Sequence, residues 1–240
     1  MADVSKLTTD RLKVSKTVNT AFGVYGESIS QGLAASVVPP PEGFAAMALR
    51  WLGESLTTAE SNLRAADIAH TLEAADDAEP RTRRDATSRE TRAVLLSASD
   101  SVRGIYGAGV SENLGLEATL PDRPDQVNHL AESIVVALRA APAPTPLFEG
   151  ASLNLATLAT RIENQRLVLQ AALDKVALEE RELQTTMSER DKATARWSRT
   201  YAGVAMILSG LATLAGLDDL ASKVKPTERR RAGIPEEGEG

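Results

Sequence analysis

Residues 155–211 read LATLATRIENQRLVLQAALDKVALEERELQTTMSERDKATARWSRTYAGVAMILSGL, and this stretch decides the fold of the chain. No proline or glycine occurs between Ala151 and Ala202, and apolar side chains recur along it every seven residues. An α-helix returns to nearly the same face after seven residues, so this spacing predicts a helix with an apolar stripe. The sequence therefore predicts an all-α fold whose longest element covers 151–223.

The seven-residue repeat forms two neighbouring lines of side chains on the predicted helix. The first line is apolar at eight of nine positions, whereas the second contains Gln165, Glu179 and Thr186, so a regular two-stranded zipper is not specified. A helix with such a stripe has to bury it against something. The residues expected at the resulting interface are Leu155, Leu158, Ile162, Leu169, Val176, Leu183, Trp197, Val204, Ile207 and Leu211.

One segment of this predicted helix, 185–191, is polar in both lines. It contains Ser188 and Asp191 at the spacing of a capping box, which is typical of a helix start. Two arrangements stay open: a helical hairpin that turns at this segment, and one continuous helix.

Prolines and glycines divide the rest of the chain. Apolar spacing predicts helices over 4–22, 42–78 and 81–103 and a fourth that begins at Pro124, which together form a four-helix region over 1–140. Proline at every second position over 142–146 predicts an extended Pro/Ala linker over 141–150. Residues 224–240, which end in glutamate and glycine, are expected to be a disordered tail.

An internal repeat lies within the four-helix region. Gly23, Tyr25 and Gly26 recur 81 positions later as Gly104, Tyr106 and Gly107, and five of eleven aligned positions are identical. We interpret this as a duplicated helix–turn–helix unit, with copies at about 4–78 and 81–140, although chance similarity between two glycine turns is an alternative. Each glycine pair is expected to end a helix, with the tyrosine packed where the chain leaves it.

Composition excludes several functions. The 240 residues contain no cysteine, two histidines and 3% aromatic residues, and the formal net charge is −6. Thiolate chemistry is excluded, and an acidic chain disfavours nucleic-acid binding. Asp67 and His70 lie one helical turn apart, but a carboxylate-bridged metal site needs more ligands than this pair. We therefore predict no enzyme activity, cofactor, metal or small-molecule substrate.

These observations predict a non-enzymatic structural or scaffold protein. Its long helix is expected to pair with a second copy or with another helical protein. The alternative is a membrane-active or membrane-tethering protein that uses the uncharged segment 201–217. The first residues of the chain have no secretory pattern, so a cytoplasmic location is expected.

Overall fold

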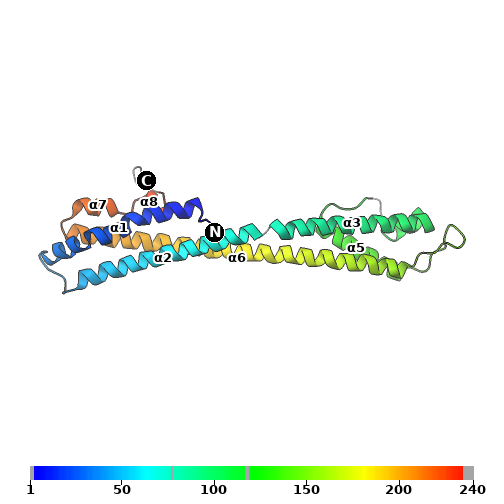
Figure 1. The fold of residues 1–240 in the computed structure, drawn as a ribbon, viewed down its shortest axis with the longest axis horizontal. Coiled ribbons are helices and arrows are strands. Elements are labelled where there is room, and N and C mark those ends of the chain that lie inside the picture. The colour runs from blue at the N-terminus through cyan, green and yellow to red at the C-terminus, as the bar shows by residue number, and fades with distance from the viewer. Residues whose placement is uncertain (1–2, 77, 117–118, 235–240) are drawn as a thin grey trace. The chain divides into compact units, whose positions relative to one another are not determined.

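The computed structural model describes residues 3–76, 78–116 and 119–234. All regular secondary structure in these ranges is helical, which confirms the predicted all-α class. The helices are α1 (Lys6–Ala34), α2 (Phe44–Asp76), α3 (Ala78–Tyr106), α4 (Ala108–Asn113), α5 (Pro124–Ala140), α6 (Leu155–Leu214), α7 (Asp218–Val224) and α8 (Glu228–Arg231) (Figure 1).

The chain forms two compact units. Unit 1 runs to Ala74 and resumes at Leu183, and unit 2 is Ala75–Glu182. This division differs from the predicted one, in which 1–140 and 151–223 are separate regions. The physical reason is that the two ends of the apolar stripe of α6 each complete a different hydrophobic core.

Unit 1 has a core built by α1, α2, the C-terminal part of α6, and α7. The rings of Trp197 and Tyr201 stack at its centre, with centroids 5.4 Å apart, and the Trp197 Nε1–H donates a hydrogen bond of 2.9 Å to Ser15 Oγ of α1. The indole nitrogen is therefore satisfied although the ring is fully buried. Other fully buried large side chains of this core are Ile29, Leu52, Leu56, Leu63 and Leu208.

The start of α1 is fixed to α2 by a buried carboxylate. Ser5 caps α1, because its Oγ accepts from the Thr8 amide at 3.3 Å. The Ser5 amide and hydroxyl in turn donate to the two carboxylate oxygens of Asp67, at 2.6 and 2.9 Å. Two donors at the helix start are thus satisfied by a residue 62 positions away, which ties the two helices together.

The two glycine motifs of the internal repeat adopt different structures. The expectation that Gly23 and Gly26 end a helix is wrong: both lie inside α1, which continues to Ala34. Gly107 does end α3, with a φ of +92° that favours glycine. Inside α1, Gly26 faces α2, and a Cβ built there would lie at an ordinary contact distance of 3.8 Å from Leu49 Cδ1. The duplication itself stays a prediction.

Unit 2 packs α3, α4, α5 and the N-terminal part of α6 around a second core. A small polar network is enclosed by this core: Ser99 and Ser111 both donate to the carbonyl oxygen of Leu116, at 3.0 and 2.9 Å. The network fixes the turn after α4 to α3. The largest fully buried side chains are Leu95, Leu116, Ile134, Ile162 and Leu169.

The Pro/Ala segment 141–150 belongs to unit 2 and does not separate two domains. The Leu147 amide donates to the Ile105 carbonyl at 2.8 Å. The Tyr106 hydroxyl donates to the carbonyl and accepts from the amide of Leu153, both at 3.0 Å. Residues 141–146 have no regular secondary structure and 147–150 form a bend and a turn, and these bonds hold the end of the segment against the C-terminus of α3.

Helix α6 is continuous through 185–191, so no hairpin turn occurs there. An exposed ion pair between Lys192 and Glu189, at 2.7 Å and one turn apart, lies beside this polar segment. Ser188 and Asp191 are inside the helix and do not form its start.

The expected disordered tail is wrong for its described part. Residues 228–231 form α8, and the Ser198 hydroxyl donates to the Arg231 carbonyl at 3.3 Å, which holds this short helix on α6. Thr227 caps α8 with its side chain. The remainder of the predicted tail, 235–240, lies outside the described residues.

Candidate functional site

The expected interface residues of α6 lie mainly inside the chain's own cores. Six of the ten are buried: Leu158, Ile162, Leu169 and Val176 in unit 2, and Trp197 and Val204 in unit 1. Leu211 packs partly buried against the unit 1 core. Leu155 packs partly buried against the unit 2 core, and Leu183 is half-buried. Ile207 differs, because 45% of its surface is exposed.

This placement limits which side chains of the α6 stripe another molecule could reach. A side chain that already packs inside one chain is not available to another molecule without unfolding. Of the ten expected residues, Ile207 is the one that keeps a largely exposed side chain.

The uncharged segment 201–217 contributes to the core of unit 1. Tyr201, Ala205, Leu208 and Ala212 have no exposed surface. Among the described residues, no helix is long and apolar enough to cross a membrane.

Asp67 and His70 contact different partners and do not form one site. Both oxygens of Asp67 accept from Ser5, and the residue is 1% exposed. His70 Nδ1 lies 3.3 Å from Thr186 Oγ1 of α6. The carboxylate is therefore committed to capping α1, and the imidazole to a contact between α2 and α6.

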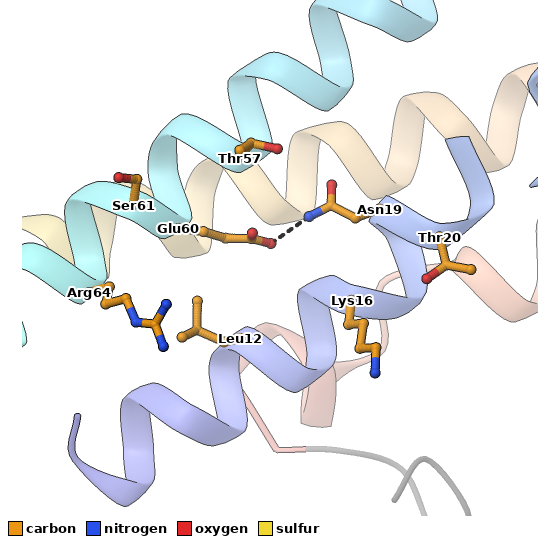
Figure 2. A pocket seen from close by; sticks show the side chains of 8 residues that line it. All are labelled: Leu12, Lys16, Asn19, Thr20, Thr57, Glu60, Ser61 and Arg64. Carbon is orange, nitrogen blue, oxygen red and sulfur yellow. Dashed lines mark hydrogen bonds between the residues drawn. The ribbon is translucent and has the colours of Figure 1, made fainter. Parts of the chain in front are cut away.

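A polar groove of about 700 Å³ lies between α1 and α2 in unit 1. Figure 2 shows Glu60 reaching from α2 toward Asn19 of α1, whose amide Nδ2 donates to Glu60 Oε1 at 2.8 Å. Lys16 and Thr20 of α1 lie to the right of Glu60 in this view, and Arg64 of α2 lies to its left. The full lining is Leu12, Lys16, Asn19, Thr20, Thr57, Glu60, Ser61 and Arg64.

Burial raises the pKa of the Glu60 carboxyl, although hydrogen bonds from Ser15 and Asn19 oppose the shift. Ser15 also accepts from Trp197, so the groove is linked by hydrogen bonds to the centre of the core. The arrangement offers a carboxylate, an amide and hydroxyl groups for recognition of a polar group. Sequence reasoning missed Ser15, Asn19 and Glu60, because single polar residues next to an apolar stripe give no pattern.

An exposed apolar face on α2 is the second candidate surface of unit 1. Phe44, Met47 and Trp51 are spaced i, i+3 and i+7, which puts them on one face of the helix. They are 41%, 67% and 62% exposed, respectively. Arg50 and Glu54 form an exposed ion pair of 2.8 Å beside this face. We refer to Phe44, Met47 and Trp51 as the α2 stripe.

Comparisons with models of protein families, with curated proteins and with solved structures found no match.

Proposed function

We propose that this chain is a non-enzymatic structural protein that assembles with a second copy of itself through the α2 stripe. The observation that carries the proposal is the exposure of Phe44, Met47 and Trp51 on one helix face. Large apolar side chains gathered in one exposed row are typical of interaction surfaces. Tryptophan and methionine are also enriched in protein interfaces relative to the rest of the surface.

Charge complementarity favours a second copy as the partner. Arg50 and Glu54 flank the stripe and are exposed. Two α2 helices can pack antiparallel about a twofold axis that passes at the level of residue 52 along each helix. Arg50 of each copy then faces Glu54 of the other. The same axis brings the two Trp51 side chains together at the centre of the contact.

This proposal keeps the expected class of function and changes the surface. The sequence pointed to the stripe of α6 for pairing with a second copy or another helical protein, and most of those residues pack within the chain. The α2 stripe is a row of apolar side chains left exposed in unit 1.

Sedimentation velocity over a hundredfold range of concentration tests the proposal. The full chain is expected to show a monomer–dimer equilibrium, and Trp51→Ser is expected to raise its dissociation constant by about tenfold or more. Leu72→Ser is the matched control, because Leu72 is an exposed apolar residue of α2 outside the stripe. A chain that stays monomeric, or a dimer that both variants weaken equally, contradicts the proposal.

A charge-reversal pair tests the orientation of the two helices. Arg50→Glu brings like charges together across the proposed contact and should weaken the dimer, and addition of Glu54→Arg should restore it. A double variant as weak as the single one contradicts the antiparallel arrangement.

A further inference from the structure

A groove of about 440 Å³ between α1 and α7 carries three lysines. Lys13 and Lys16 belong to α1 and Lys223 to α7. The remaining lining residues are Thr17, Thr20, Ala21, Tyr25, Leu220 and Val224, all within unit 1. Part of α1 therefore lines this groove as well as the polar groove of Figure 2, since Lys16 and Thr20 line both.

The charge of this groove opposes that of the whole chain. Its described lining contains three ammonium groups and no carboxylate, whereas the chain has a formal net charge of −6. None of the three lysines forms an ion pair with another described residue. Like charges gathered without a counter-ion raise the local potential and attract an anion.

The floor of the groove is apolar. Ala21, Leu220 and Val224 are buried members of the unit 1 core. Tyr25 is 37% exposed and follows Ala21 by one helical turn. The groove thus combines a charged part with an apolar part.

The direction of the two helices sorts these parts along the groove. A Cβ at Gly32 meets the backbone of Ala215, and one at Gly233 meets the side chain of Arg11, so the chain after 215 runs antiparallel to α1. Lys223 therefore lies toward Lys13 and Lys16, and Leu220 toward Tyr25. Lys16 and Tyr25 are nine residues apart, which is about 13 Å along a helix.

Close packing and hydrogen bonds hold this arrangement. The space at Gly32 is too small for a Cβ, so α1 and the turn before α7 approach each other directly. The Arg230 guanidinium donates to the carbonyls of Lys223 and Lys225, at 2.7 and 3.1 Å, and fixes the end of α7.

From this geometry we infer that the groove binds an organic phosphate, with the phosphate at the three lysines and an apolar group on Leu220 and Tyr25. Three ammonium groups are enough to neutralise the double negative charge of a phosphate monoester, and the hydroxyls of Thr17 and Thr20 add hydrogen-bond donors. The shared chemistry belongs to a free phosphate ester or to the headgroup of an anionic lipid.

Calorimetric titration of the full chain with hexyl phosphate, inorganic phosphate and hexanol tests the inference. Hexyl phosphate is expected to bind at least tenfold more tightly than either of the others, because only this probe occupies both parts of the groove. The double variant Lys13→Gln, Lys223→Gln should weaken this binding about tenfold or more. Lys6→Gln is the matched control, because Lys6 is exposed on the same helix outside the groove.

Flotation with phosphatidylglycerol vesicles, against phosphatidylcholine vesicles, separates the two sources. If the chain binds hexyl phosphate but does not float with the vesicles, the ligand is a free phosphate ester. If the chain floats with phosphatidylglycerol vesicles and the double variant does not, the ligand is the lipid headgroup. The inference is overturned when the chain binds neither hexyl phosphate nor phosphatidylglycerol vesicles. It is also overturned when the double variant and Lys6→Gln bind these probes equally well. Trp51→Ser should leave this binding unchanged, so failure of the assembly proposal is distinguishable.

Discussion

At the scale of single residues, the two glycine motifs show how context decides a backbone conformation. Gly26 and Gly107 occupy the same place in two similar segments, yet the former is helical and the latter has a φ of +92°. Tyr106 of the second motif is fixed by two hydrogen bonds to Leu153, whereas Tyr25 is partly exposed. A buried tyrosine with backbone partners accompanies the motif that ends a helix.

The difference predicts opposite effects of the same substitution. Gly107→Ala should lower the free energy of unfolding by about 1–3 kcal/mol, because alanine is strained at this positive φ. Gly26→Ala should raise it by about 0.5–1 kcal/mol, because alanine favours a helix interior and the new Cβ makes an ordinary contact with Leu49. Urea unfolding followed by circular dichroism measures both, and equal effects would contradict the structure.

Glu60 predicts a pH dependence at the same scale. Burial raises its pKa above the ordinary 4.5, so the folded state holds this proton more tightly than the unfolded state. The stabilisation is fully present below the unfolded pKa and is lost as the pH rises through the folded pKa. Glu60→Gln removes the titration, so the variant should gain stability relative to the native chain between pH 4 and pH 7.

Urea unfolding at both pH values measures this difference. Glu42→Gln removes a carboxylate from the exposed segment before α2 and is the control. If the free energies of unfolding of Glu60→Gln and the native chain differ by the same amount at pH 4 and pH 7, the Glu60 carboxyl is not desolvated.

At the scale of elements, α6 combines two kinds of sequence. Its apolar stripe lies in a core at both ends of the helix, whereas 185–191 lacks a fully buried side chain. Propensity and i, i+3 ion pairs support this middle segment, and packing supports the ends. The spacing of apolar residues therefore predicts that α6 is a helix, but it does not predict which other helices α6 packs against.

The burial of Leu169 predicts a large cost for its truncation. Leu169→Ala should lower the free energy of unfolding of unit 2 by about 2–5 kcal/mol, because the side chain has no exposed surface. Leu167→Ala, two residues away on the exposed face, should change it by less than about 0.5 kcal/mol. Thermal unfolding followed by circular dichroism gives both values, and a small effect at Leu169 would place this face in water.

At the scale of the whole molecule, the two units use the chain in different ways. Unit 1 is built from two separate stretches of chain, and unit 2 is one continuous stretch. A division of the chain after residue 140 removes α6 from both cores. Unit 2, by contrast, can be cut out as 75–182 with its core complete.

Two fragments test this division. The fragment 75–182 should unfold cooperatively on heating, with helical circular dichroism before the transition. The fragment 1–140 should not, because it lacks Trp197 and Tyr201 of one core and Ile162 and Leu169 of the other. Cooperative unfolding of 1–140 would contradict the two-unit description.

The sequence predicted elements better than their assembly. The bounds of α2, α3 and α5 agree with expectation within a few residues, because proline and apolar spacing mark them locally. Continuation of α1 past Gly26 was missed, because the core that buries Ile29 and Leu33 after this glycine is completed by other helices. The lysine groove was missed for the same reason: Lys223 is 210 residues from Lys13 in the chain.

The positions of the two tryptophans have a spectroscopic consequence. Trp51 is exposed and Trp197 is buried beside Tyr201, and both belong to unit 1. Unit 2 has no tryptophan, so indole emission follows the melting of unit 1 alone, while ellipticity at 222 nm follows both units. Separate midpoints from these two signals on one sample would give the stability of each unit without dividing the chain.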